Sequence, residues 1–541
     1  MSLNALSNAT AGLAATQAAI NVVSQNVANA GTAGYVKRTL TPVATGTNNL
    51  GVANGTITRS FDAAALKQLR LETSGAAYTS TKASIASQLD ALYGAPGSGA
   101  ALDGTLNTFT ESLQELSANP TSAAARTTVV SNASALASQI NGAAASVQNL
   151  RSGVEAQLGT DTQSASSLLS SVASLTAGIE LRDQILPQAQ RQLDDLAGGL
   201  ASSLTDSSRT AAMTSGVASI DLSGAIPATG NKPGAGLMAG NTLTISVTDL
   251  NNIPRNIILV ASNASPPPDI TADQTADGTA YVAAFSIKDG PGSYATVIKA
   301  VLDKLKTNNP TLPTLSVDKS TNSNFSAAAL ASGAALDIGN ITTGTSILGA
   351  QANVTLPIAT TDSATGYPQI ALFTDLSTTP PPVARLYTGS LDDNSQRTGF
   401  AQRISINPNL VGNTAALTRS STTDPTASGD RASKIYTALT SNQQTFSSSS
   451  GIGGVSAPYR ASVVGFAQDV IASQGAASAN ANALNDTQQT ALSTAQGRFA
   501  AGAGVNIDQE MSNLIALQTA YGANARILTA ARDMLNQLLQ I

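Results

Sequence analysis

The side chains that most often carry out enzyme chemistry are missing from this chain. Its 541 residues include no cysteine and no histidine, which excludes thiolate and imidazole metal sites, cysteine nucleophiles and histidine-based triads. No side chain that remains has an unperturbed pKa between pH 5 and 8. A serine activated by a lysine stays available, but nothing in the sequence marks a particular serine for that role. We therefore expect no enzyme, with no catalytic residue, no metal site and no cofactor.

Two local patterns that resemble catalytic or cofactor motifs have simpler explanations. The stretch Gly234–Ala239 fits the glycine spacing of a dinucleotide-binding turn, but that turn requires a strand before it and a helix after it. A strand pattern follows here, which favours a glycine-rich loop. The carboxylate pairs Asp194-Asp195 and Asp392-Asp393 are neighbours in sequence, and neighbours on a helix do not share a face. A general acid–base pair stays open there as the weaker alternative.

The polar residues with the most informative spacing follow the first apolar pattern of the chain. They are Asn26, Asn29, Thr32, Gly34 and Tyr35. Asn and Gly tolerate left-handed backbone, so we expect a helix to end here, and Tyr35 would then anchor an extended segment on a neighbouring element. An ordinary capped helix end is the alternative interpretation.

Helices with a coiled-coil-like seam are predicted at both ends of the chain, because apolar residues recur there every seven positions. The first series is Leu6, Leu13, Ile20 and Val27, and the second is Ile507, Leu514, Tyr521, Leu528 and Leu535. Each stripe could simply pack on a globular core. Two matching seams favour pairing of the ends with each other or with other subunits. Both seams and the polar motif form the predicted assembly interface.

Between the ends, helical spacing gives way to a β-rich pattern and then returns. One helical stripe is Leu102, Leu106, Phe109, Leu113 and Leu116, and another is Leu168, Val172, Leu175 and Ile179. Turn signals stand at Gly94–Gly97 and Asn119-Pro120. Sixteen of the 21 prolines lie between Gly216 and Asp430. In that region, β-branched runs such as 243–247 and 256–260 predict strands, with one helix near 294–305.

We therefore predict a mainly α fold with a β-rich insert, in discontinuous, nested domains. The predicted parts are an N-terminal axial helix and extended arm (1–60), the first part of a long helical bundle (61–215), one or two outer β-rich domains (216–430), the return part of the bundle (431–492) and a C-terminal axial helix (493–541). With this order, both ends would lie together.

The charge of the chain argues against a nucleic-acid partner, and the polar residues in its first segment argue against a membrane span. The net charge is −5 and charged residues make up only 11% of the chain, whereas a duplex-binding surface needs clustered Lys and Arg. The first charged side chain is Lys37, and Asn and Gln residues interrupt the apolar ones before it. This segment is therefore expected to be neither a signal peptide nor a membrane span. An extracellular subunit would need a dedicated export route.

The polar motif resembles the N-terminal signature of flagellar axial proteins, the family of rod, hook and hook-associated subunits. The motif residues fit the form Asn-x-x-Asn-x-x-Thr-x-Gly-Tyr, which follows the first helix in that family. Residues 504–535 look like the family's closing helix. Within the family, the Gly-Val-Asn-Ile-Asp sequence at 504–508 and the stretch 402–410 are most similar to hook-associated proteins of the hook–filament junction. Near 180–195 the sequence departs from the family pattern, and Pro187 is unexpected there.

The resemblance implies a structural role outside the cell, in the bacterial flagellum. The chain would leave unfolded through the flagellar export channel, without a cleavable signal peptide, aided by a cytoplasmic chaperone at its C-terminal region. It would then form a ring between the hook protein and the second hook–filament junction protein by self-association. The terminal helices would pair into an inner tube, with the bundle outside them and the β-rich part outermost.

Three alternatives remain at this point. The first is another axial subunit, either a hook protein or a flagellin-like filament subunit. The helical pattern after Phe61 disfavours the hook protein, and Gly34-Tyr35 disfavours flagellin. The second is an enzyme on an axial scaffold, which the missing His and Cys disfavour. The third is a surface adhesin whose β-rich part binds a ligand.

Overall fold

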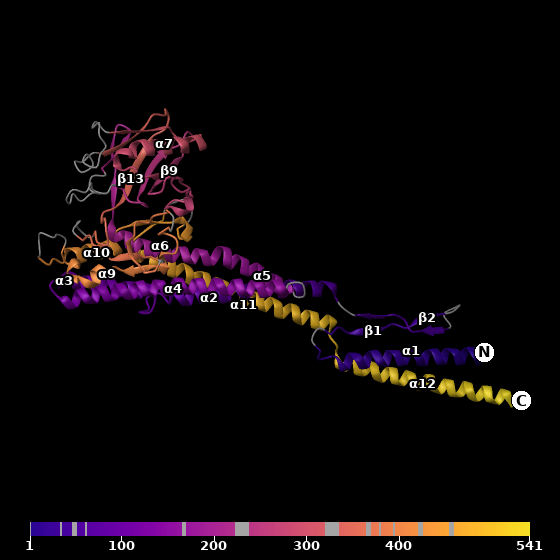
Figure 1. The fold of residues 1–541 in the computed structure, drawn as a ribbon. Coiled ribbons are helices and arrows are strands. Elements are labelled where there is room, and N and C mark those ends of the chain that lie inside the picture. Colours follow the sequence, from indigo (N-terminus) through magenta and orange to yellow (C-terminus); the bar gives the residue numbers. More distant parts are fainter. Residues whose placement is uncertain are drawn as a thin grey trace. The chain divides into compact units, whose positions relative to one another are not determined.

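A computed structural model describes residues 2–32, 35–45, 51–59, 62–164, 169–221, 237–319, 335–363, 369–377, 380–392, 395–419, 426–453 and 459–540. The chain divides into two compact units, each assembled from separate stretches. One contains residues 1–81, 160–177 and 481–541, and the other contains 82–159 and 178–480. The prediction of a mainly α fold with a β-rich insert is confirmed (Figure 1). None of the helices in the described ranges is long and apolar enough to cross a membrane.

The first unit contains both ends of the chain. α1 (Ser2–Ala28) and α12 (Ile507–Leu539) lie side by side, with the N- and C-termini at the same end of the pair (Figure 1). After α1 the chain forms an extended arm of two antiparallel ladders. The ladders pair β1 (Arg38–Leu40) with β4 (Ile57–Arg59) and β2 (Val43–Thr45) with β3 (Gly51–Ala53). Both β1 and β3 contact α1.

The remaining long helices follow the predicted helical spacing. They are α2 (Ala63–Tyr93), α3 (Leu102–Ala118), α4 (Ala123–Ser164), α5 (Leu169–Glu180), α6 (Leu186–Thr205), α10 (Asp430–Thr440) and α11 (Val463–Ala503). α2 and α3 end at the two turn signals, before Gly94 and Asn119. The apolar face predicted for α3 is confirmed, since all five of its residues are buried.

The apolar stripe predicted for α5 is wrong. Val172 and Ile179 are each 44% exposed, whereas the small side chains of Ala173 and Ala177 are buried. Small residues let a helix approach its neighbours closely, so the contact face of α5 follows its alanines. A search for large apolar residues cannot detect such a face. Leu168, the first residue of the predicted stripe, lies outside the described residues.

The unexpected Pro187 follows a local change of helix type. Leu181–Ile185 form a π-helical turn (η2), in which the N–H of Leu186 donates to the carbonyl of Leu181, five residues back. Pro187 has no N–H to donate to the carbonyl of Asp183, four residues earlier. Asp183 lies in the wider π-helical turn, where the regular α-helical hydrogen bonds are already replaced. The chain therefore passes from α5 to α6 without a break in helical structure.

The β-rich insert contains two sheets around one apolar core. Their strand orders are β10-β9-β8-β13-β5 and β11-β12-β7-β6. Among the strand pairs in the described ranges of these sheets, only β9 and β10 pair in parallel. The strands are β5 (Asp206–Thr210), β6 (Ala212–Thr214), β7 (Val217–Asp221), β8 (Thr242–Thr248), β9 (Pro254–Ser262), β10 (Tyr281–Ser286), β11 (Leu315–Lys319), β12 (Ala335–Asn340) and β13 (Ile347–Thr355). The strands predicted at 243–247 and 256–260 are confirmed. β5 begins inside the range predicted for the bundle.

One helix, α7 (Tyr294–Asn308), packs on this core at the position predicted for it. On β8 the apolar Leu243, Ile245 and Val247 enter the core, while Thr242, Thr244 and Ser246 alternate with them on the opposite face. Alternation of this kind gives the five-stranded sheet an apolar face and a face with polar side chains, to which Ile258 and Val260 of β9 add a small apolar cluster. The polar face borders the crevice described below.

Shorter strands and helices lie within the insert and between it and α11. A third sheet has the order β15-β14-β16, and β17 pairs with β18. The strands are β14 (Phe373–Leu376), β15 (Ala384–Leu386), β16 (Ile404–Ile406), β17 (Gln444–Phe446) and β18 (Tyr459–Ala461). The short helices are η4 (Ala272–Gln274), η5 (Pro291–Ser293), η6 (Phe400–Gln402), α9 (Pro408–Gly412), η7 (Thr414–Leu417) and η8 (Ser448–Ser450).

Candidate assembly site at the paired termini

The two terminal helices pair antiparallel, in a defined register. Asn26 of α1 contacts Glu510 of α12, and Gly12 faces Asn524. From 12 to 26 and from 510 to 524, each helix advances fourteen residues between the two contacts, about 21 Å at 1.5 Å per residue. A Cβ placed on Gly12 would lie 2.9 Å from Asn524 Nδ2. Glycine at this position therefore lets the two helices approach closely.

A buried asparagine joins the end of α1 to the segment that follows it. The Asn26 side chain donates from Nδ2 to Arg38 O at 2.8 Å and to Glu510 Oε2 at 2.9 Å. Its Oδ1 accepts from Tyr35 Oη at 3.0 Å and from Arg38 N at 3.0 Å. These four bonds use both donors and both acceptor positions of the amide. Tyr35 is thereby held against the end of α1.

A glutamate at the start of α12 completes this polar cluster. Glu510 is 1% exposed. Lys37 Nζ lies 2.8 Å from its Oε1, close enough for an ion pair although not aligned as a hydrogen bond. The backbone N–H of Lys37 donates to Ala503 O at 2.9 Å. Asn506 caps α12 by accepting from Gln509 N at 3.1 Å, and the N-terminal end of a helix favours an acidic residue such as Glu510.

The other residues of the polar motif act within their own segment. Asn29 Nδ2 donates to Gln25 O at 2.9 Å, and the Thr32 hydroxyl lies 3.5 Å from Asn29 Oδ1. These contacts close the last turn of the helix. Gly34 lies outside the described residues.

The seam predicted on α1 lies beside the face that contacts α12. Leu13, Ile20 and Val27 directly follow Gly12, Ala19 and Asn26, and one residue turns a helix by about 100°. All four seam residues, Leu6 included, are half-buried. Of the α1 side chains that the structure describes, the buried ones are instead Ala9, Ala15, Val22, Val23 and Asn26.

On α12 the predicted seam is only partly covered by the contact with α1. Leu514, Leu528 and Leu535 are half-buried, whereas Tyr521 and Ile507 are exposed. Further large apolar side chains on this helix are exposed in the single chain; they are Met511, Ile515, Ile527, Met534 and Leu539. Whether these faces assemble with other subunits stays a prediction.

Sequence reasoning missed Lys37 and Glu510 as members of the site. A signal for Glu510 was present, because Glu510, Leu517, Asn524 and Ala531 form a second seven-residue series on α12. That series contains two polar residues, so a search for apolar repeats passes over it. For Lys37, the available signal was that it is the first charged side chain in the sequence.

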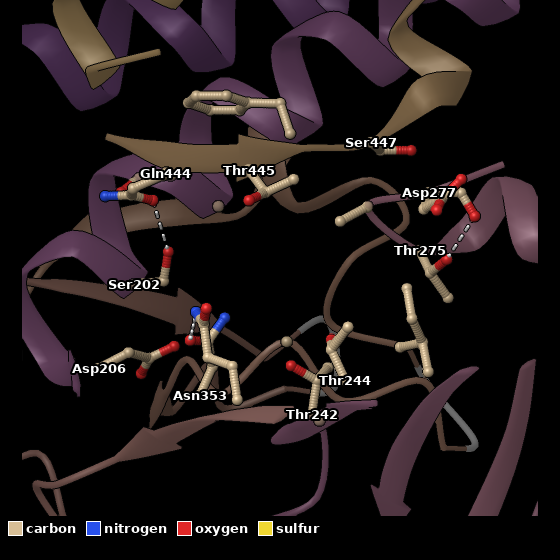
Figure 2. Close-up of a pocket in the computed structure, with 18 of the residues that line it drawn as sticks. Ser202, Asp206, Thr242, Thr244, Thr275, Asp277, Asn353, Gln444, Thr445 and Ser447 are labelled. Carbon is tan, nitrogen blue, oxygen red and sulfur yellow. Dashed lines mark hydrogen bonds between the residues drawn. The ribbon is translucent and has the colours of Figure 1, made fainter. Parts of the chain in front are cut away.

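A polar crevice of about 590 Å³ lies between α6 and the polar face of the five-stranded sheet (Figure 2). Ser202, Asp206, Thr242, Thr244 and Asn353 are among the residues that line it. Many of its polar groups bond to one another. Ser246 Oγ donates to Asn256 Oδ1 at 2.7 Å, and Asn256 Nδ2 donates to Asp277 Oδ2 at 2.8 Å. These bonds hold Ser246, Asn256 and Asp277 to one another along one side of the crevice.

The two carboxylates singled out at 194 and 195 make separate contacts at this crevice. Asp194 accepts from the backbone N–H of Gly399 at 2.8 Å and of Ala401 at 2.9 Å, which holds the η6 loop on α6. Burial raises the pKa of Asp195 to about 6, and the nearby Arg397 opposes that rise. Asp392 accepts from Asn263 N, and Asp393 lies outside the described residues.

A third carboxyl in the crevice is also perturbed. Burial raises the pKa of Asp206 to about 6, against the hydrogen bonds that it accepts from Thr355 and Thr205. Within the described ranges, no group of three or more acidic side chains is placed to hold a metal ion. The stretch 234–239 is described only from Leu237 onward, and a strand follows it.

Two family models match this chain. Residues 86–180 match the flagellar hook-associated protein FlgK helical domain. Residues 495–541, which include all of α12, match the flagellar basal body rod FlgEFG protein C-terminal model.

Curated relatives agree with these matches. Flagellar hook-associated protein 1 of Bacillus subtilis is 32% identical over 217 residues, which is 37% of this chain and 43% of that protein. The proteins of the same name from Salmonella typhimurium and Salmonella typhi are each 34% identical over 142 residues, a quarter of either chain. The matched part thus spans less than half the length of these relatives. The chain is therefore similar to flagellar hook-associated proteins over part of its length, and its C-terminal segment is similar to that of flagellar rod proteins.

Proposed function

We propose that this chain is a structural subunit of the bacterial flagellum that forms the junction ring between hook and filament. The observation that carries the proposal is the pairing of its ends. α1 and α12 form an antiparallel pair closed by a buried polar cluster, and α12 still exposes large apolar side chains. Exposed apolar surface of this kind is typical of an interaction site.

The exposed apolar residues of α12 suit contacts with two neighbours. At about 100° per residue, Ile507, Met511 and Ile515 share one flank of the face that contacts α1. Ile527 and Met534 lie on the opposite flank. A subunit in a closed ring meets one neighbour on each side through two different surfaces. Self-association into a ring would bury both flanks.

The remaining partners follow from the family. We propose that the ring binds the hook protein on one side and the second hook–filament junction protein on the other. Before export, a cytoplasmic flagellar chaperone would cover the C-terminal region, where α12 is rich in exposed apolar side chains. The chain would act outside the cell, as part of the flagellum.

The proposed role is non-enzymatic, and one alternative remains in the same structural class. A hook protein or a flagellin-like filament subunit would also pair its ends. The match of residues 86–180 to a hook-associated helical domain favours the junction. The mutual pairing of polar groups in the crevice favours a structural over a catalytic use of its carboxylates.

Complementation tests the proposal. In the bacterium that encodes this chain, deleting its gene should leave hooks without filaments, and flagellin should appear in the medium. A plasmid copy should restore filaments and motility. Deletion cells that keep normal filaments would contradict the junction role. Deletion cells that lose their hooks would favour the hook-protein alternative.

A further inference from the structure

The seven-residue repeats on the terminal helices do not by themselves fix how α1 and α12 pair. Sliding one helix by seven residues, about 10 Å, brings equivalent apolar stripes together again. Much of the contact face is also built from small residues, such as Ala9 and Ala15. Packing of small and apolar side chains therefore distinguishes only weakly between the observed register and its neighbours.

Buried polar side chains distinguish these registers strongly. Of the side chains described in α1 and α12, Asn26 and Glu510 are the only buried polar ones. They touch each other, with Asn26 Nδ2 2.9 Å from Glu510 Oε2. A buried polar or charged group without its partner is unfavourable. The helix pair should therefore be less stable in any register that separates these two residues.

Both neighbouring registers do separate them. The observed register places Ala19 opposite Leu517, seven residues along from the Asn26–Glu510 contact on each helix. A shift of seven residues in one direction puts Asn26 opposite Leu517. The opposite shift puts Glu510 opposite Ala19. In each case an amide or a carboxylate would face an apolar side chain in the contact.

We propose that Asn26 and Glu510 are the residues that determine the register of the terminal helix pair. Lys37 supports Glu510 at 2.8 Å, and Tyr35 supports Asn26 at 3.0 Å. The same cluster fixes the turn after α1, because Asn26 also bonds Arg38 through its N–H and its carbonyl. This inference concerns the folded chain alone. It stands or falls independently of the flagellar role proposed above.

Disulfide trapping in the full chain reads out the register directly, because the chain has no cysteine of its own. Gly12→Cys with Asn524→Cys reports the observed register. Gly12→Cys with Leu517→Cys or with Ala531→Cys reports the two shifted registers. Since a disulfide forms only between closely placed Cβ atoms, we expect rapid cross-linking for the first pair alone. Non-reducing electrophoresis and mass spectrometry measure the yields.

The decisive variant combines Asn26→Leu with Glu510→Leu, which replaces both polar partners and leaves neither alone. We expect helix content, measured by circular dichroism, to persist. The ratio of shifted to native cross-links should rise roughly tenfold or more, as when a polar residue that specifies coiled-coil register is removed. The matched control, Gln17→Leu with Asn513→Leu, adds two leucines at exposed positions of the same helices. It should keep the native pattern.

A second comparison covers the case in which the double variant loses helix content. Glu510→Gln keeps an oxygen that accepts from Asn26 and should retain the native cross-link, whereas Glu510→Met should not. The proposal is overturned if the double leucine variant gives the same cross-link ratio as its control. It is also overturned if Glu510→Gln and Glu510→Met behave alike, or if the unsubstituted background forms shifted cross-links as readily as native ones.

Discussion

Asn26 and Asn29 are both asparagines at the end of α1, but their side chains have different surroundings. Asn26→Leu removes partners from Tyr35, Arg38 and Glu510 while the glutamate stays buried. Loss of a partner for a buried charged group should destabilise the terminal pair by about 2–4 kcal/mol. Faster hydrogen exchange along both α1 and α12 would reveal this loss.

The matched control for this prediction is Asn29→Leu. The Asn29 side chain bonds only within its own segment, to Gln25 and Thr32. The substitution should cost below about 1 kcal/mol and leave α12 unaffected. Equal effects of the two substitutions on α12 exchange would show that the cluster does not couple the helices.

Asp206 should make the stability of the second unit depend on pH. Its pKa is about 6 in the folded chain, against an ordinary value of 3.8. Between about pH 4 and pH 6 the folded state therefore binds more protons than the unfolded state, and the free energy of unfolding falls as pH rises. Asp206→Asn removes this pH dependence. The free energy of unfolding of the variant, relative to that of the natural chain, should therefore rise by on the order of 1 kcal/mol between pH 4 and pH 7.

Denaturant unfolding at a series of pH values measures this difference. Asn353→Ala, a neutral change that lines the same crevice, serves as the control, and its difference from the natural chain should not vary with pH. A constant difference for Asp206→Asn as well would mean that Asp206 is not protonated near pH 6 in the folded chain.

At the residue scale, the sequence was sufficient to identify one half of the polar cluster. The spacing of Asn26 and Tyr35 marks them as a motif because they lie close together in the chain. Their partner Glu510 is 484 positions away. No local pattern links residues at such a distance, and the pairing emerges only when the two helices are placed side by side.

At the element scale, periodicity located the terminal helices but not the orientation of their faces. The predicted seam on α1 consists of large apolar residues, whereas the contact face holds Gly12, Ala15 and Val22. The same difference appears in α5, where alanines are buried and Val172 and Ile179 are exposed. In an alanine-rich chain, close helix approach selects small residues for the contact. Large residues then lie on the flanks, where another chain can cover them.

Residues of α12 that stabilise the helix pair should be at least half-buried in the single chain, whereas residues proposed for assembly are exposed. Ile515 is 60% exposed, so Ile515→Glu should change the stability of the purified chain by less than about 0.5 kcal/mol. In the assembled ring the carboxylate would be buried, so filaments should be lost. Leu528→Glu, at a half-buried position, should lower the stability of the purified chain as well, by about 1–3 kcal/mol.

Thermal unfolding of each purified variant and filament counts on cells that produce it check this pair of predictions. Normal filaments on Ile515→Glu cells would show that this flank of α12 stays exposed on assembly. An Ile515→Glu chain that melts as early as Leu528→Glu would show that the flank packs within the single chain.

At the scale of the whole molecule, the insert leaves and re-enters the helical part at one place. The N–H of Leu356 donates to Thr205 O at 3.0 Å, and the N–H of Ile370 donates to Leu204 O at 2.9 Å. Replacing residues 206–355 by two glycines should therefore leave a chain that folds, since the ends to be joined are already hydrogen-bonded neighbours. Circular dichroism and size-exclusion chromatography should report a helical, monomeric product.

The position of the cut matters for this deletion. A cut at 240–377 would remove β14 from its sheet with β15 and β16 and would leave β5 and β7 without their partners β13 and β12. We expect that product to aggregate, because unpaired strand edges promote association. Aggregation of the 206–355 deletion to the same degree would show that the helical part depends on the insert. Composition and proline density located the insert, but its exact edges required the strand pairings.

The central claim is that this chain is the junction subunit between hook and filament, and its position on the flagellum tests that claim most directly. A small epitope placed in the exposed turn between β12 and β13, for example at Thr343, can be labelled with gold in cells that make hooks but no flagellin. The account predicts label confined to the distal tip of each hook. Label spread along the hook, or its absence from hooks in cells that export the chain, would contradict it.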